Sequence, residues 1–376
     1  MTPVVTVAHD GAVIDCVAFE HQPALIGAAP DVVRQAVARK DRAVADNRRT
    51  LATMSPASQP HRDLCPPDTV GLARFRLLAN PQGDAPQRCL PPVKRRPAAD
   101  LGSSSHSTVP SEGHASPTAG YSYDYAITDY INVAGANDSY ALFSVGTDGV
   151  PLATCRADTV CHSLNQLWWL TTDGGTPDTR SLETGWIASN YFTTQVTTSF
   201  FVFSTNDDYH GDKDDQYNAA GGFVQYPGGP IIFGAPVSNA SYALSYSRTG
   251  GDANGATLYG FPISAAGSTA YSWPGSWVEL GTYLPSRFAS GAAFDYFGAG
   301  LEVCIADGEA SDATASGRIL GWGTSQANQA IKGAFACDPP GDGLAFAYTG
   351  GATWSPACPY ADAQGDLVQF SGSPKA

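Results

Sequence analysis

The sequence predicts an all-β protein, in which a large antiparallel two-sheet β-sandwich of jelly-roll type follows a small N-terminal segment with one helix. First, the 40 Gly and 27 Pro among 376 residues exclude a long helical bundle. Second, 43% hydrophobic residues can build a sizeable core and exclude a chain that is disordered throughout. Third, short aromatic segments of period two are separated by Gly, Pro, Asp and Asn turns, which is typical of antiparallel sheets.

Charge is unevenly distributed along the chain. Residues 1–118 carry a net charge of +2 and residues 119–376 a net charge of −16. At the junction, residues 91–118 are poor in apolar side chains and contain Lys94-Arg95-Arg96, which indicates an exposed linker that proteases can cut. We therefore expect an N-terminal segment at 1–90, a linker at 91–118 and a β-sandwich domain at 119–376.

The total charge and the hydropathy limit the partners. A net charge of −14 is opposite in sign to that of a general nucleic-acid binder. No stretch of the chain reaches the roughly 18 apolar residues that a membrane-spanning helix needs. We expect neither a nucleic acid nor a membrane as partner.

One helix and a series of strands are expected in chain order. Asp31 is expected to cap a helix that runs to about Leu51 and carries Val33, Val37 and Val44 on its apolar side. Short alternating segments downstream predict strands at 140–145, 182–187, 199–204, 223–226, 242–246, 301–305, 318–322 and 344–348.

Eight cysteines, an even number, indicate an oxidising compartment. We expect an extracellular protein, although the first 25 residues show neither the basic nor the apolar region of a signal peptide. Cys155 and Cys161 bracket a short polar loop, and Cys337 and Cys358 bracket a Gly/Pro-rich hairpin, so each pair can form a local disulfide. The pairing of the other four remains open: Cys16, Cys65, Cys89 and Cys304.

Histidine, aspartate and cysteine offer weak candidates for chemistry. His162 and His210, the two histidines of the large domain, lie near no nucleophile elbow and are interpreted as surface residues. The run from Asp207 to Asp215 lacks the spacing of an EF-hand loop and is interpreted as a solvated acidic turn. No Cys/His cluster has zinc-site spacing, so we expect no metal and no cofactor.

Glutamate is scarce in the large domain, and two glutamates lie inside apolar strands. Alternation puts Leu182 and Trp186 on one face of a strand and Glu183 on the other, and Glu302 is likewise opposite its apolar neighbours. Each glutamate has a glycine two positions before or after it on its own face, which leaves room above the sheet for a ligand. Two carboxylates in one groove can divide acid and base roles. The alternative is that both lie on the solvated side of a half-exposed sheet.

Several short motifs occur together in a characteristic order. Segments 163–168 (SLNQLW) and 181–186 (SLETGW) resemble the paired "SLSQLW" and "TVEAGW" motifs of the neprosin family. Further similar segments follow and precede them, at 222–225, 280–288, 298–303, 10–17 and 65–70. The ordered matches span nearly the whole chain.

The resemblance implies a secreted glutamic peptidase that prefers to cleave after proline, with protein or peptide substrates. It implies that Glu183 and Glu302 are the catalytic pair, and that the N-terminal segment is a propeptide that inhibits its own domain. Two coupled carboxylates imply an acidic optimum. For the same groove we consider Gln166 as a donor to the oxyanion, and Trp186 and Tyr283 as aromatic walls.

Two other functions fit the same residues. A glycoside hydrolase of jelly-roll fold also uses a carboxylate pair and aromatic side chains in a groove. A non-catalytic extracellular binding sandwich needs no glutamate pair at all. The charge difference further suggests that electrostatic attraction helps to hold the N-terminal segment on the acidic domain.

Overall fold

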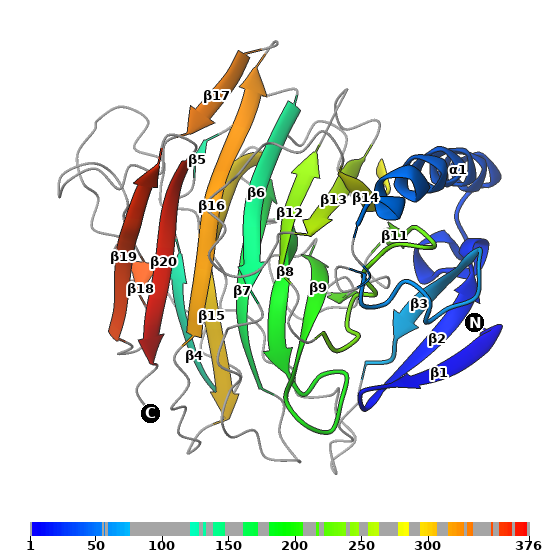
Figure 1. Ribbon diagram of the computed structural model, residues 1–376, viewed down its shortest axis with the longest axis horizontal. Coiled ribbons are helices and arrows are strands. Elements are labelled where there is room, and N and C mark those ends of the chain that lie inside the picture. The colour runs from blue at the N-terminus through cyan, green and yellow to red at the C-terminus, as the bar shows by residue number, and fades with distance from the viewer. Residues whose placement is uncertain are drawn as a thin grey trace.

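The described part of the chain is mostly β-strand in antiparallel sheets, with a single α-helix (Figure 1). The expected predominance of β structure is therefore confirmed. The computed structural model describes residues 2–54, 56, 59–75, 121–127, 131–132, 138–146, 161–171, 180–205, 216–217, 222–237, 241–247, 255–262, 277–285, 294–306, 315–326, 329–333, 347–348, 353–362 and 365–373. The expected linker at 91–118 lies outside these residues.

The N-terminal unit, which we define as residues 2–75, contains a three-stranded sheet of order β1-β2-β3. A disulfide between Cys16 and Cys65 joins β2 to the segment that precedes β3 and closes a loop of 49 residues. By lowering the entropy of the unfolded chain, this cross-link contributes about 4 kcal/mol to the free energy of unfolding. The elements of the unit are β1 (Val5–His9), β2 (Ala12–Ala18), two 3₁₀ turns (Phe19–His21 and Pro23–Leu25), α1 (Pro30–Ala52) and β3 (Thr69–Ala73).

The expected helix is confirmed as α1, but the expected Asp31 cap is wrong. Pro30 occupies the start of the helix, where its missing N–H costs nothing, and Ala29 precedes it without a side-chain cap. Asp31 instead lies in the first turn, where its charge complements the helix dipole. The fully buried residues of α1 are not the three valines but the set Ala36, Ala43, Asn47 and Leu51.

Two large antiparallel sheets make up the rest of the described chain. The eight-stranded sheet has the order β10-β9-β8-β7-β15-β4-β18, with β5 beside β15. Its strands are β10 (Gln216–Tyr217), β9 (Thr197–Thr205), β8 (Arg180–Ser189), β7 (His162–Thr171), β15 (Phe294–Ala306), β4 (Tyr121–Ile127), β18 (Ala347–Tyr348) and β5 (Ile131–Asn132).

The nine-stranded sheet has the order β11-β14-β13-β12-β6-β16-β20-β19, with β17 beside β16. Its strands are β11 (Phe223–Gln225), β14 (Val278–Tyr283), β13 (Ala256–Pro262), β12 (Ser241–Ser247), β6 (Asp138–Gly146), β16 (Ala315–Gln326), β20 (Gly365–Ser373), β19 (Thr353–Asp362) and β17 (Gln329–Gly333). Every strand expected from the sequence falls within or overlaps one of the observed strands.

Aromatic side chains connect the two large sheets. The rings of Phe200 on β9 and Tyr242 on β12 are 5.3 Å apart, and the hydroxyl of Tyr283 on β14 donates to the carbonyl of Phe203 on β9 at 3.1 Å. The hydroxyl of Tyr246 on β12 donates to the carbonyl of Glu183 on β8, also at 3.1 Å. These contacts identify the face of the eight-stranded sheet that carries Phe200 as the one turned toward the nine-stranded sheet.

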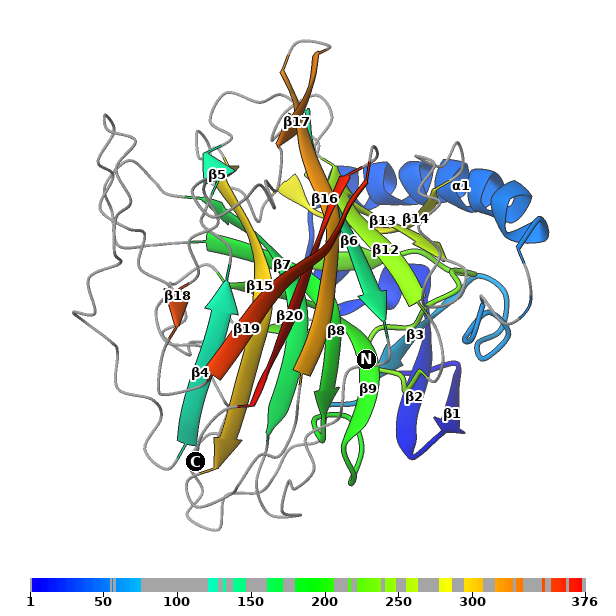
Figure 2. The same ribbon diagram turned by 60° about the vertical axis from the view of Figure 1, so that its left-hand side comes forward.

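The N-terminal unit lies at the β11–β14 end of the nine-stranded sheet (Figures 1 and 2). Apolar side chains fill much of this contact. Phe19, Leu25 and Val70 of the unit form one buried cluster with Val224 and Tyr226. A second buried cluster combines residues of β2 with the loop after β11: Ile14, Cys16, Ile232 and Ala235.

Two buried side-chain amides of the N-terminal unit bind main-chain groups at this sheet edge. Gln22 donates to the carbonyl of Gln225 at 3.0 Å and accepts from its N–H at 2.9 Å. Asn47 donates to the carbonyl of Glu279 at 2.7 Å and accepts from its N–H at 2.8 Å. Each amide therefore satisfies the two main-chain groups that a neighbouring strand would otherwise pair.

His61 makes a third polar contact between the unit and the loop after β11. The N–H of Ile232 donates to Nδ1 at 2.9 Å, and Nε2 lies 2.9 Å from the carbonyl oxygen of Pro236. Only the neutral ring with its proton on Nε2 satisfies both partners. The pKa of His61 is lowered to about 4, mainly by burial. The Pro236 carbonyl and Asp10 act against this, and the nearby His9 acts in the same direction as burial.

Charge contributes locally to this contact. The ion pairs between described residues all lie within the N-terminal unit. Across the contact, Arg39 and Arg42 of α1 lower the pKa of Glu279, although burial raises it more strongly. Arg39 also donates to the hydroxyl of Thr282 at 3.1 Å. Among the described residues, apolar burial and bonds to the main chain thus account for most of the contact.

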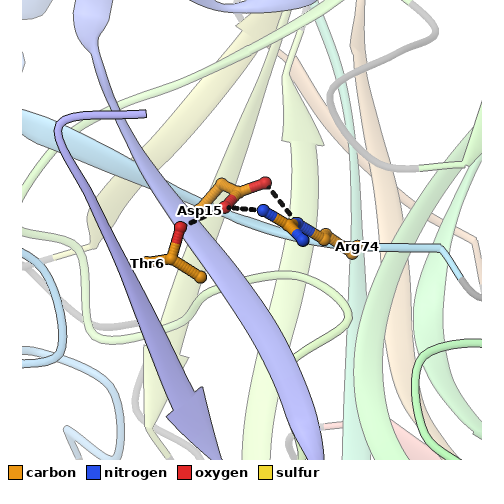
Figure 3. A network of polar contacts seen from close by, with 3 residues as sticks. All are labelled: Thr6, Asp15 and Arg74. Carbon is orange, nitrogen blue, oxygen red and sulfur yellow. Dashed lines mark hydrogen bonds and ion pairs between the residues drawn. The ribbon is translucent and has the colours of Figure 1, made fainter. Parts of the chain in front are cut away.

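A carboxylate on β2 fixes the end of the N-terminal unit. Arg74 donates to Asp15 through Nε at 2.6 Å and through a terminal nitrogen at 2.8 Å, and the Thr6 hydroxyl donates to the same carboxylate at 2.7 Å (Figure 3). The bond to Arg74 lowers the pKa of Asp15 more than burial raises it. Through its bonds to Thr6 and Arg74, Asp15 therefore connects β1, β2 and the segment after β3.

We expect Asp15→Asn to loosen residues 69–75 at neutral pH, because the amide cannot accept both guanidinium bonds. Since the folded pKa is lowered, the stabilisation exists above the unfolded pKa of about 3.9 and is lost as the pH falls through the folded value. Limited proteolysis after residue 75 at pH 7 measures the effect. Asp31→Asn, at an exposed position, is the control, and equal cleavage of both variants contradicts the expectation.

Candidate functional site

The site is built on one face of the eight-stranded sheet, around Glu183 on β8. The register pairs Glu183 with Trp168 on β7 and with Phe203 on β9. Directly paired residues of antiparallel strands lie on the same face. Because Phe200 faces the nine-stranded sheet, Glu183 and Phe203 lie on the opposite face of the eight-stranded sheet.

Glu183 is buried and hydrogen-bonded. Its side chain and backbone together are 3% exposed, and its Oε1 accepts a hydrogen bond of 2.8 Å from the hydroxyl of Ser181. Ser181 is two residues earlier on the same strand face and is 1% exposed. Sequence reasoning missed this serine, although its position at i−2 from Glu183 is a usable signal.

Gln166 on β7 lies next to Glu183 on the same face. It pairs with Gly185 on β8 and with Gly300 on β15, so a glycine lies on each side of it. Gln166 is fully buried, and within the described part of the chain neither its Nε2 nor its Oε1 has a hydrogen-bond partner. A buried amide without hydrogen bonds lowers the stability of the fold. Gln166 therefore suits a ligand that supplies the missing hydrogen bonds.

Glu302 on β15 has a register position on the same face. It pairs with Leu164 on β7, whereas Glu183 pairs with Trp168, so the two glutamates are offset by four residues on either side of β7. Gln166 is the diagonal neighbour of both. From diagonal spacings of 7–8 Å, the two glutamate Cα atoms are about 15 Å apart. They are therefore not register partners, and Gln166 lies between them.

The two aromatic candidates lie elsewhere. Trp186 pairs with Phe200, which places it on the face toward the nine-stranded sheet, and it is 1% exposed. Tyr283 belongs to the nine-stranded sheet, is fully buried and packs its ring 6.0 Å from that of Tyr246. Both residues fill the space between the sheets, and neither lies beside Glu183. For Trp186 the alternation along β8 already implies this, whereas the position of Tyr283 on the other sheet carries no sequence signal.

The interpretation of His162 as a surface residue is wrong. His162 is 1% exposed, begins β7 on the Glu183 face, and its Nδ1 lies 2.7 Å from the hydroxyl of the buried Tyr191. His210 and the run Asp207–Asp215 lie outside the described residues. Within the described residues, no three His, Cys, Asp or Glu side chains come together to hold a metal.

The cysteine candidates are only partly covered. Cys161 is fully buried and disulfide-bonded. Cys155 and Cys337 lie outside the described residues, and for Cys358 and Cys304 only the strand is described. The structure adds the pair Cys16–Cys65, which the sequence left open.

Comparison with known proteins completes these observations. No helix among the described residues has the length and hydropathy to span a membrane. The chain matches no protein-family model, and no curated protein is significantly similar to it.

Proposed function

We propose that the protein is an acid-acting glutamic endopeptidase that hydrolyses peptide bonds, with a preference for cleavage after proline. One observation carries the proposal: Glu183, Gln166 and Glu302 form a diagonal across three adjacent strands, with glycines at 185 and 300 beside the middle residue. A peptide laid over the two glycines has a carboxyl group at either end of this diagonal and an amide donor at its centre.

The mechanism needs the two glutamates in different protonation states. An ionised glutamate takes a proton from a water molecule, whose oxygen attacks the scissile carbonyl carbon. The other glutamate, protonated, donates to the carbonyl oxygen, and the Gln166 amide stabilises the oxyanion. The C–N bond then breaks as the carbonyl re-forms, and the leaving nitrogen takes up the proton that the first glutamate removed from water. Acid conditions keep one of two carboxyl groups protonated, so activity is expected to be highest in acid.

The proposal extends to the architecture and to the compartment. The two large sheets form one jelly-roll-like sandwich at 119–376, and residues 1–90 are a propeptide joined to it by a cleavable linker at 91–118. In support, Gln166 and Glu183 are at most 3% exposed, so a substrate reaches them only after part of the chain moves. The disulfide-bonded Cys16, Cys65 and Cys161 support an oxidising, extracellular compartment.

A panel of proline-containing peptides tests the proposal. The full-length protein is preincubated at pH 4 and then assayed between pH 3 and 7, with and without inhibitors of serine, cysteine and metallopeptidases. We expect cleavage that is strongest in acid, resists all three inhibitors and leaves proline at the new C-terminus. Polysaccharide hydrolysis without peptide cleavage identifies a glycoside hydrolase instead, and a folded protein that cleaves neither substrate is a binding module.

A further inference from the structure

Ser181 and Glu183 form a hydrogen-bonded polar pair on β8. Both belong to the same strand face, and the hydroxyl of Ser181 donates to Oε1 of Glu183 at 2.8 Å. The residues beside them in the register on β9 are Thr205 and Phe203. The serine is 1% exposed and the glutamate 3%, so solvent does not compete for this hydrogen bond.

The Ser181 hydroxyl donates to Glu183 when the glutamate is ionised, whereas a protonated Glu183 can itself donate to the hydroxyl. A hydroxyl that donates to a carboxylate oxygen stabilises the charged form and lowers the pKa of the acid. Burial has the opposite effect. The Ser181 bond therefore offsets part of the cost of keeping Glu183 ionised inside the protein.

Glu302 has different register and sequence neighbours on the same face. Its register partner on β7 is Leu164, and the residue beyond that on β8 is Ile187, both of them buried and apolar. Its own neighbours at i−2 and i+2 are Gly300 and Cys304, neither of which has a hydroxyl. Among the described paired strands, the other side chain on this face that is a carboxyl group or an imidazole is His162. Ser181 therefore has no hydroxyl counterpart two residues before or after Glu302, and a hydrogen bond to only one carboxyl group of a pair separates their pKa values.

We propose that Ser181 is a positioning residue that keeps Glu183 in its carboxylate form, so that Glu183 is the general base of the pair. The base role of Glu183 rests on the proposed peptidase function. The effect of Ser181 on the ionisation of Glu183, which we call the Ser181–Glu183 link, does not. In this role Ser181 acts through its hydrogen bond to Glu183. The serine at i−2 thereby decides which of the two glutamates activates the water.

The ionisation of Glu183 can be read directly, because the chain has only six glutamates. In full-length protein labelled with ¹³C at the glutamate carboxyl, the Glu183 signal is the one that Glu183→Gln removes. We expect Ser181→Ala to raise its titration midpoint by about one pH unit, the effect of losing one hydrogen bond to a charged group. Ser181→Thr, which keeps the hydroxyl, restores the wild-type midpoint.

Ser199→Ala is the matched control. Ser199 lies on the same face, on the adjacent strand β9, and is equally buried, but its hydroxyl has no hydrogen-bond partner. Its loss leaves the Glu183 midpoint unchanged. If the titration midpoint of Glu183 in Ser181→Ala is the same as in Ser199→Ala and the wild type, the inference is overturned.

Kinetics then decide the role of Glu183. A base is active only when deprotonated, so Ser181→Ala is expected to move the acidic limb of the kcat/KM profile up by the same amount as the NMR midpoint. If Ser181→Ala instead shifts the alkaline limb of the kcat/KM profile, Glu183 acts as the acid, and its assignment as the base is overturned. A wild-type protein that cleaves no peptide ends the proposed function and the base role together, and the NMR shift then still shows the Ser181–Glu183 link.

Discussion

Glu183→Gln is expected to reduce kcat/KM for peptide cleavage by about 10³-fold at every pH, because an amide cannot accept a proton from water. The substitution preserves the fold. The Ser181 hydroxyl can still donate to the amide oxygen, and the Tyr246 hydroxyl binds the main-chain carbonyl of residue 183, which does not change. The loss is therefore one of chemistry. Initial rates on a proline-containing peptide at pH 4 measure it, with thermal unfolding as the check on folding.

Glu279→Gln is the matched control for this substitution. Glu279 is half-buried and burial raises its pKa, but it lies on β14 of the other large sheet. Asn47 binds its main chain, which the substitution leaves intact. We expect this variant to retain wild-type rates. Equal losses in both variants would mean that Glu183 matters only for folding or charge.

Acidification is expected to protonate His61 and so to weaken the contact between the N-terminal unit and the loop after β11. The free imidazole has a pKa of 6.5 and the docked one about 4, so the docked state disfavours the proton. The stabilisation by neutral His61 is complete above pH 6.5 and is lost progressively as the pH falls to about 4. The full difference amounts to about 3 kcal/mol, or about 300-fold in the docking equilibrium. Protonation also removes the acceptor of the Ile232 N–H.

Thermal unfolding between pH 4 and 7 tests this expectation. His61→Gln keeps one acceptor and one donor but does not titrate, so its stability is expected to fall less than that of the wild type as the pH falls from 6.5 to 4. His21→Gln, at an exposed position in the same unit, is expected to follow the wild type. Identical pH profiles for His61→Gln and the wild type would show that His61 is not the acid-sensitive group.

Local patterns in the sequence were enough to predict the helix and eight of the strands, but not others such as β7, which carries Gln166. Leu182 and Trp186 are both buried on the face opposite Glu183, as their alternation with it implies. The helix is where its periodicity places it. Its start differs, because Pro at the first helical position outweighs the capping preference of Asp31.

The polar contacts of the N-terminal unit could not be predicted, because their partners are main-chain groups far along the chain. Gln22 binds Gln225, 203 residues away, and Asn47 binds Glu279, 232 residues away. Main-chain groups carry no sequence signal. The burial of Glu183 and Gln166 has the same origin: alternation assigns them to a face, whereas only the tertiary structure shows whether solvent reaches it.

The most direct test of the central claim is mass spectrometry of one peptide with a single internal proline, incubated at pH 4 with acid-treated wild type, Glu183→Gln and Glu302→Gln. We expect the wild type to cut the peptide once, after the proline, and each variant to leave the peptide intact. Cleavage by both variants at the wild-type rate, or an intact peptide with folded wild type, would contradict it.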